Sequence, residues 1–145
     1  MNGPIQFFFD TSVLIAASDA TDPRHPESRA LLSSATPSNS ACGAHTLAEV
    51  YAVLSRFPGG KKVRPQFAGV IVEQIAARLT VVPLGADEYA ATIRTVAQMG
   101  LGGGIVFDAV LLACARKVDA QHIYTWNEKH FRLIAPDLSN RITTP

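Results

Sequence analysis

Four polar side chains that could do chemistry lie far apart in the sequence, at Asp10, Glu49, Asp108 and Asn127. Asp10 directly follows the apolar run 5–9, which suits a buried strand, and precedes a second apolar run over 13–17. A carboxylate between a buried strand and a helix lies where open α/β sheets bind their ligands. The first question is therefore which other side chains meet Asp10 at that edge.

The other candidates also lie at predicted junctions between strands and helices. Glu49 lies in the first turn of a helix that opens at Thr46, and Asp108 in the first turn of the most apolar helix of the chain. Asn127 follows the strand predicted over 122–125. Because such junctions converge on one edge of a parallel sheet, we expect these side chains to meet there.

Carboxylates gathered in one crevice would repel one another. No Arg or Lys lies within one helical turn of Asp10, Glu49 or Asp108, so the local sequence offers no ion pair. Asp108 also has apolar neighbours on both sides, where an unpaired charge is costly. A divalent cation would remove the repulsion, and hard oxygen ligands suit Mg²⁺ or Mn²⁺.

Each of these residues also has a purely structural explanation. Asp10 could cap the helix that follows it, and Glu49 could form a capping box with Thr46. Asp108 could complement the dipole of its helix, and Asn127 could stabilise a turn. The joint pattern of the acids, rather than any one of them, favours a metal site.

Further residues are candidates for contacts with phosphate groups. Thr11 and Ser12 lie at the start of a predicted helix, a position suited to anions. The most basic segment of the chain either contacts phosphates or is a solvated loop, and it contains Arg56, Lys61, Lys62 and Arg64.

The order of the predicted elements indicates an α/β fold. Short strands over 5–9, 41–44, 80–82, 122–125 and 133–134 alternate with helices over 13–17, 27–35, 46–57, 67–79, 86–99 and 105–118. Alternation of this kind predicts a central parallel sheet covered by helices on both faces. We expect residues 1–145 to form a single domain, because no linker or repeat divides the chain.

The overall composition excludes several classes of protein. Apolar residues make up 48% and charged residues 17% of the 145 residues, which is typical of a globular protein. No apolar run approaches the ~20 residues needed to span a membrane, and no signal peptide is evident. A cytoplasmic protein with Cys42 and Cys114 reduced and buried is the simplest interpretation.

Four segments, 9–14, 47–51, 107–113 and 125–131, together resemble the PIN-domain family, and within it the VapC-type ribonuclease toxins of bacterial toxin-antitoxin pairs. They span nearly the whole chain in the expected order. In this resemblance Asp10, Glu49 and Asp108 fall on the family's three acidic positions and Asn127 on a polar one. His130 departs from the pattern, since many relatives carry an acid there, and the departure puts a second metal ion in doubt.

The resemblance implies a three-layer α/β/α PIN-like domain. It also implies a Mg²⁺- or Mn²⁺-dependent endoribonuclease that hydrolyses RNA, usually forms a homodimer and is held inactive by a small antitoxin protein. In the mechanism that we expect, Asp10 and Asp108 hold the metal. Glu49 binds it through water or orients the attacking water, and Asn127 hydrogen-bonds a phosphate oxygen or a water.

Two other functions stay open. An apolar strand that ends in Asp also begins phosphatases that form an aspartyl-phosphate, although Ser12 stands where their second acid is usual. A non-catalytic PIN-like module that binds RNA or a protein is the other, and the departure at His130 leaves room for it.

Overall fold

The computed structural model of the protein describes residues 3–56 and 63–145. A parallel sheet of five strands runs through these residues, in the spatial order β3-β2-β1-β4-β5. The strands are β1 Phe7–Phe9, β2 Ser40–Gly43, β3 Thr80–Val82, β4 His122–Tyr124 and β5 Ile142–Thr143. Since β1 lies between β2 and β4, Asp10 follows the central strand.

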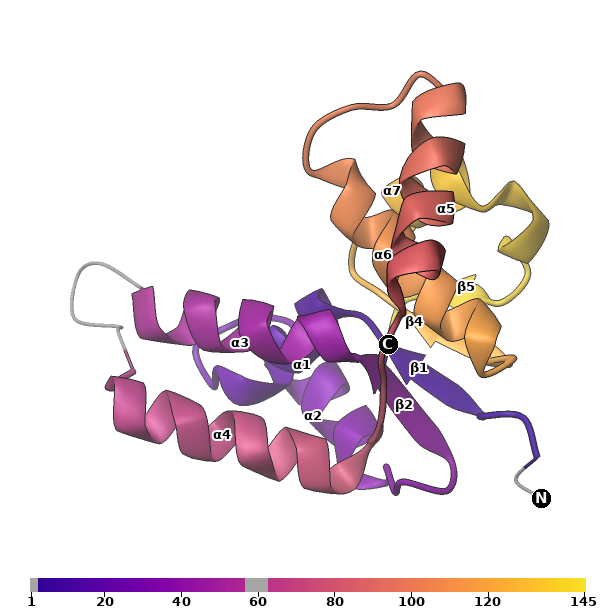
Figure 1. Ribbon diagram of the computed structural model, residues 1–145. Coiled ribbons are helices and arrows are strands. Elements are labelled where there is room, and N and C mark those ends of the chain that lie inside the picture. Colours follow the sequence, from indigo (N-terminus) through magenta and orange to yellow (C-terminus); the bar gives the residue numbers. More distant parts are fainter. Residues whose placement is uncertain (1–2, 57–62) are drawn as a thin grey trace.

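Helices cover both faces of the sheet. They are α1 Thr11–Ser18, α2 His25–Ser33, α3 Ala44–Arg56, α4 Pro65–Arg78, α5 Ala86–Gln98, α6 Ile105–Lys117 and α7 Glu128–Ile134, with a 3-10 helix over Pro136–Leu138. Figure 1 shows α1 to α4 gathered on one side of the strands and α5 to α7 on the other. The predicted three-layer α/β/α architecture with a central parallel sheet is confirmed.

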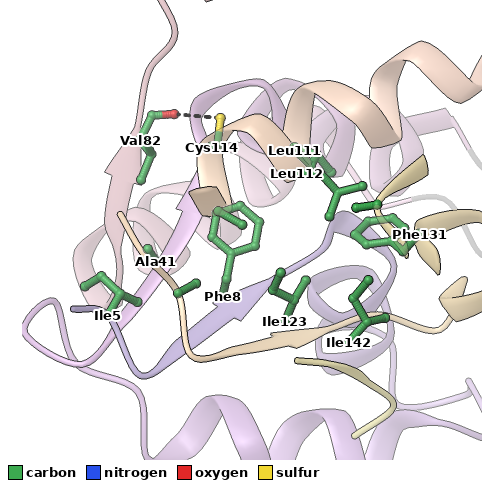
Figure 2. Packing of buried hydrophobic residues seen from close by; sticks show 13 residues of the cluster. Ile5, Phe8, Ala41, Val82, Leu111, Leu112, Cys114, Ile123, Phe131 and Ile142 are labelled. Carbon is green, nitrogen blue, oxygen red and sulfur yellow. Dashed lines mark hydrogen bonds between the residues drawn. The ribbon is translucent and has the colours of Figure 1, made fainter. Parts of the chain in front are cut away.

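The apolar run of β1 is buried on both faces because successive side chains of a strand point in opposite directions. Phe8 packs with Leu111 and Phe131 from the α6 and α7 side (Figure 2). Phe9 belongs to the opposite cluster, with Val13 and Val50 from the α1 and α3 side. Apolar burial on both faces holds the end of β1, and with it Asp10, at a fixed place in the sheet.

Both cysteines are free and buried, as predicted. The thiol of Cys114 donates to the carbonyl of Val82 at 3.5 Å, which joins α6 to β3 (Figure 2). Burial raises the pKa of the Cys42 thiol to about 12 and that of Cys114 to about 11. Both groups are therefore poor nucleophiles and have a structural role in the core.

The last predicted strand, over 133–134, is wrong. These residues end α7, in which Arg132 and Glu128 form an ion pair at 2.8 Å across one helical turn. Ile134 packs on the core from the helix, and the edge strand is instead β5. A short apolar pair cannot distinguish strand from helix, because both place one such side chain inward. No helix in the described ranges has the length and apolar character that crossing a membrane requires.

Candidate active site

Asp10 lies at the junction between β1 and α1, and only 2% of the residue is exposed. The hydroxyl groups of Ser12 and Thr125 both donate to its Oδ2 atom at 2.7 Å. Its backbone N–H donates to the carbonyl of Tyr124 at 2.9 Å, which aligns the ends of β1 and β4. Asp10 occupies the N-cap position of α1, but its side chain makes no capping hydrogen bond. Two side-chain hydroxyls therefore hold its carboxylate, and the backbone N–H groups of Thr11 and Ser12 also lower its pKa.

Glu49 lies beyond the first turn of α3, because the helix already begins at Ala44. The predicted helix start at Thr46 is therefore wrong, and so is the capping box. The buried hydroxyl of Thr46 instead lies 2.9 Å from that of Thr11. Thr11 also donates to the Oε1 atom of Glu49 at 3.3 Å, and the Nε2 atom of His45 lies 3.7 Å from the same oxygen. Thr11, the first residue of α1, therefore contacts the face of α3 that bears Glu49.

Asp108 lies in the first turn of α6, as predicted. Its side chain is 20% exposed, and its Oδ2 atom lies 3.6 Å from the Nδ1 atom of His130, whose side chain is 64% exposed. No Lys or Arg of the described ranges forms an ion pair with Asp10, Glu49 or Asp108. Histidines are the basic groups that approach these acids.

The charge of Asp10 acts on both of the other carboxyl groups, and that of Glu49 acts on Asp108. Burial, followed by the charge of Asp10, raises the pKa of Asp108 to about 6, and Glu49 adds to the rise while His130 opposes it. Burial also raises the pKa of Glu49, which His45 and Thr11 lower and Asp10 raises again. Burial raises the pKa of Asp10, and the hydroxyls of Ser12 and Thr125 oppose that rise. Acids from β1, α3 and α6 therefore share one region of the molecule, where their negative charges are costly.

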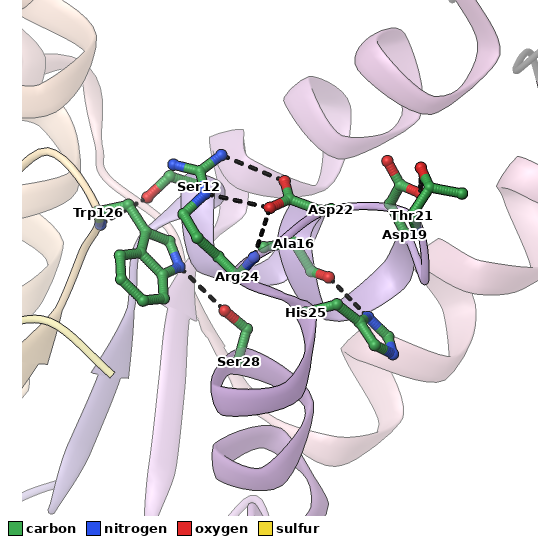
Figure 3. A network of polar contacts seen from close by, with 9 residues as sticks. All are labelled: Ser12, Ala16, Asp19, Thr21, Asp22, Arg24, His25, Ser28 and Trp126. Carbon is green, nitrogen blue, oxygen red and sulfur yellow. Dashed lines mark hydrogen bonds and ion pairs between the residues drawn. The ribbon is translucent and has the colours of Figure 1, made fainter.

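Asn127 precedes α7, and its exposed side chain makes no capping hydrogen bond to that helix. The backbone N–H of Asn127 donates to the hydroxyl of Thr125 at 2.9 Å. The neighbouring Trp126 is bound more firmly, since its backbone N–H donates to Ser12 at 3.0 Å and its indole N–H to Ser28 at 2.9 Å (Figure 3). The segment that bears Asn127 is thus fastened to both α1 and α2.

The hydroxyls of Thr11 and Ser12 are engaged within the protein, where they hold Glu49 and Asp10. Their predicted contact with substrate stays a prediction. Arg56 ends α3, and Arg64 is the N-cap residue of α4; both are exposed. The other two predicted basic residues, Lys61 and Lys62, lie outside the described residues.

The donors at this site suit a hard divalent cation. They are carboxylate oxygens, which Mg²⁺ and Mn²⁺ prefer as ligands, and the charges of Asp10 and Glu49 add to the burial that raises the pKa of Asp108. Across 3–56 and 63–145, however, no three His, Cys, Asp or Glu side chains already lie close enough together to surround an ion. The chemistry of the donors fits a metal, while their present spacing does not yet form a coordination shell.

The sequence of this chain matches a PIN domain profile over residues 7–135, which covers most of its length. The chain therefore belongs to the PIN domain family. A comparison of the sequence with curated proteins finds no match.

Solved structures with a similar fold include toxin-antitoxin proteins. VapC20 of Mycobacterium tuberculosis, described as a toxin that cleaves the sarcin-ricin loop, is 24% identical, with a TM-score of 0.69 over 86% of this chain and 92% of that one. The DNA-bound VapBC of Salmonella typhimurium is 19% identical, with a TM-score of 0.66 over 97% of this chain and 98% of that one. VapBC2 of Rickettsia felis, bound to a promoter DNA fragment, is 19% identical, with a TM-score of 0.60 over 89% and 93%. At these identities the likeness establishes the fold.

The sequence does not reveal that Thr125 holds Asp10, or that Thr46 contacts Thr11, which in turn holds Glu49. Thr125 and Thr46 are both fully buried polar residues at this edge, and neither was singled out as part of the site. A hydroxyl at the end of a predicted strand was the available signal for Thr125, since it lies two residues before Asn127. The helix begins at Ala44, two residues before Thr46, so the Thr46 hydroxyl is free to contact Thr11 instead of capping the helix.

Proposed function

We propose that this protein is a Mg²⁺- or Mn²⁺-dependent endoribonuclease that acts as a single domain and is the toxin of a toxin-antitoxin pair. The main support is the convergence of Asp10, Glu49 and Asp108 from separate parts of the chain, where the charge of Asp10 adds to the burial that raises the pKa values of the other two. Membership of the PIN domain family adds to it. So does the similarity in fold to VapC20, a toxin described as cleaving the sarcin-ricin loop.

In the proposed mechanism Asp10 and Asp108 would hold a Mg²⁺ or Mn²⁺ ion through their carboxylate oxygens. A bound Mg²⁺ or Mn²⁺ supplies Lewis-acid stabilisation of the charge that develops on the scissile phosphate. Glu49 orients the attacking water. Both of its described contacts, from Thr11 and His45, go to Oε1, so Oε2 has no partner among the described residues. The Asn127 amide hydrogen-bonds a phosphate oxygen from the segment that Thr125 and Trp126 hold.

Cleavage of a structured RNA tests this function. We expect cleavage with Mn²⁺, none with EDTA, and a loss of at least about 100-fold for Asp10→Asn, because that variant removes a charged ligand. Asp87→Asn is the matched control, since Asp87 lies on the exposed surface of α5. Cleavage that survives both EDTA and Asp10→Asn would exclude the mechanism.

A non-catalytic binding module is the second candidate, favoured by the absence of a ready-made cluster of three ligands in the described residues. Calorimetry with Mn²⁺ separates the two, because a pure binding module need not bind the ion.

The phosphatase alternative has less support. Ser12, rather than an acid, lies two residues after Asp10, and its hydroxyl is bonded to that carboxylate. A beryllium fluoride adduct on Asp10 would support the phosphatase alternative.

The proposed partners are an RNA substrate, a small antitoxin and a second copy of the chain, and the proposed location is the cytoplasm. Large apolar side chains exposed on neighbouring helices, among them Tyr51, Phe67 and Val70, support a protein partner. Arg56 and Arg64, with Lys61 and Lys62 between them in sequence, are proposed to contact RNA phosphates.

A further inference from the structure

An exposed aromatic ring lies directly beside the candidate active site. Phe107 is 48% exposed, although it precedes Asp108 in the first turn of α6. Its ring lies parallel to the imidazole of His45, with 5.3 Å between the ring centroids and 4° between the planes. Nothing in the hydrophobic core requires Phe107, because it belongs to neither buried cluster.

The stacked pair is joined to the acids through His45. One helical turn separates His45 from Glu49, and its Nε2 atom lies 3.7 Å from the Oε1 atom of Glu49. The side chain of His45 is itself 34% exposed. The imidazole therefore has Phe107 against its ring and a proposed catalytic carboxylate against its edge. A group stacked on this pair would lie next to a phosphate held at the acids.

The approach to Phe107 is open. Gly102, Gly103 and Gly104 lead into α6, and a Cβ atom built on any of them would meet nothing within 4 Å. Gly103 has a φ of 71°, which side chains other than glycine rarely adopt. Residues 102–104 therefore carry no side chain that would block a polynucleotide.

We propose that His45 and Phe107 form a stacking platform for one unpaired base of the RNA substrate, next to the scissile phosphate. This inference rests on the proposed ribonuclease function. Aromatic side chains bind single-stranded RNA by stacking on its bases, largely without regard to base identity. A flat RNA base suits this site better than the apolar surface of a partner protein would. Ile105 and Val106 are only partly exposed, and the glycines add no apolar side chain.

The test uses a short unpaired oligoribonucleotide that contains the fluorescent base 2-aminopurine. EDTA keeps the RNA intact while its binding and the quenching of its fluorescence are measured. Phe107→Leu keeps an apolar side chain but removes the flat ring, whereas Phe107→Tyr keeps the ring. We expect Phe107→Leu to weaken binding about 10-fold and to reduce the quenching, and Phe107→Tyr to preserve both. Tyr89→Leu is the matched control, because Tyr89 is an exposed aromatic residue on α5, 37% exposed, with no role in the proposed site.

A second measurement follows cleavage in Mn²⁺. Phe107→Leu should raise KM for the unpaired RNA about 10-fold and leave kcat nearly unchanged, because the base lies outside the reacting bonds. If Phe107→Leu binds and quenches like the unmodified protein while Mn²⁺-dependent cleavage persists, the platform is wrong and the ribonuclease proposal stands. If Phe107→Leu changes only self-association in sedimentation, the ring belongs to a protein interface and the platform is again wrong. If the unmodified protein neither binds nor cleaves RNA, both proposals fall.

Discussion

The hydroxyl of Thr125 lies 2.7 Å from the Oδ2 atom of Asp10, although 115 positions separate the two residues in the chain. Both residues are buried, at the ends of the neighbouring strands β4 and β1. The same hydroxyl accepts a hydrogen bond from the backbone N–H of Asn127 at 2.9 Å. One small side chain therefore holds the most buried acid and the turn that bears the proposed phosphate ligand.

Replacement of Thr125 by Val should destabilise the protein by about 2 kcal/mol, because a buried carboxylate loses a charge-assisted hydrogen bond. Thr125→Ser, which keeps the hydroxyl, should lose less than half as much. Urea denaturation at neutral pH measures the difference. Equal stabilities of the Val and Ser variants would show that the hydroxyl contributes nothing.

The raised pKa of Asp108 makes stability depend on pH. The pKa rises from 3.8 for the free group to about 6 in the folded protein, so between these values the folded state binds more protons than the unfolded chain. This group therefore lowers stability as pH rises from about 4 to about 6. Asp108→Asn should remove that loss, so its unfolding free energy should rise by about 1 kcal/mol relative to wild type over this range. This figure is reduced because the side chain is partly exposed and solvent screens its charge.

Denaturation curves at intervals from about pH 4 to about pH 7 test this prediction, with Asp87→Asn as the exposed control. The quantity to follow is the difference in unfolding free energy between Asp108→Asn and wild type, since other titrating groups largely cancel in it. A difference that stays constant across the range would contradict the assigned pKa direction.

Metal binding should reverse the cost of the clustered acids. At about 100 times its Kd, Mn²⁺ should raise the unfolding free energy near neutral pH by about 2.7 kcal/mol, and less near pH 5, where Asp108 holds a proton. Asp10→Asn should lose most of the effect. His130→Asp, which adds an acid beside Asp108, should bind Mn²⁺ more tightly. Calorimetric titration measures all three proteins, and identical heats for wild type and Asp10→Asn would argue against a metal at Asp10.

The close approach of α6 to β2 gives a prediction about packing. A Cβ atom at Gly43 would lie 2.8 Å from Cδ2 of Leu111 and 3.3 Å from Sγ of Cys114, so Gly43→Ala should cost about 1–3 kcal/mol. The matched control is a substitution that should instead raise the stability. Gly69 lies inside α4 with nothing within 4 Å of its Cβ position, and Gly69→Ala should gain about 0.5–1 kcal/mol. Thermal unfolding of both variants tests the pair, and a stabilising Gly43→Ala would contradict the packing shown here.

Much of the fold could be predicted from local pattern. The apolar run before Asp10 and the alternation of strands with helices predicted a parallel sheet with helices on both faces, and the sheet has that form. The error at 133–134 and the late start of the Thr46 helix arose at element ends. There a few apolar or hydroxyl side chains suit either structure until their packing partners are known.

The sequence by itself determined that Asp10 and Asp108 stand at the starts of helices, because their apolar neighbours specify the elements around them. Only the tertiary structure decided what each acid contacts. Thr125 holds Asp10, Thr11 holds Glu49 and His130 approaches Asp108. Such contacts depend on strand order and helix packing, which bring together residues that no local pattern connects. The pKa of Asp108 follows from the same cause, since burial and the charge of Asp10 act through space rather than along the chain.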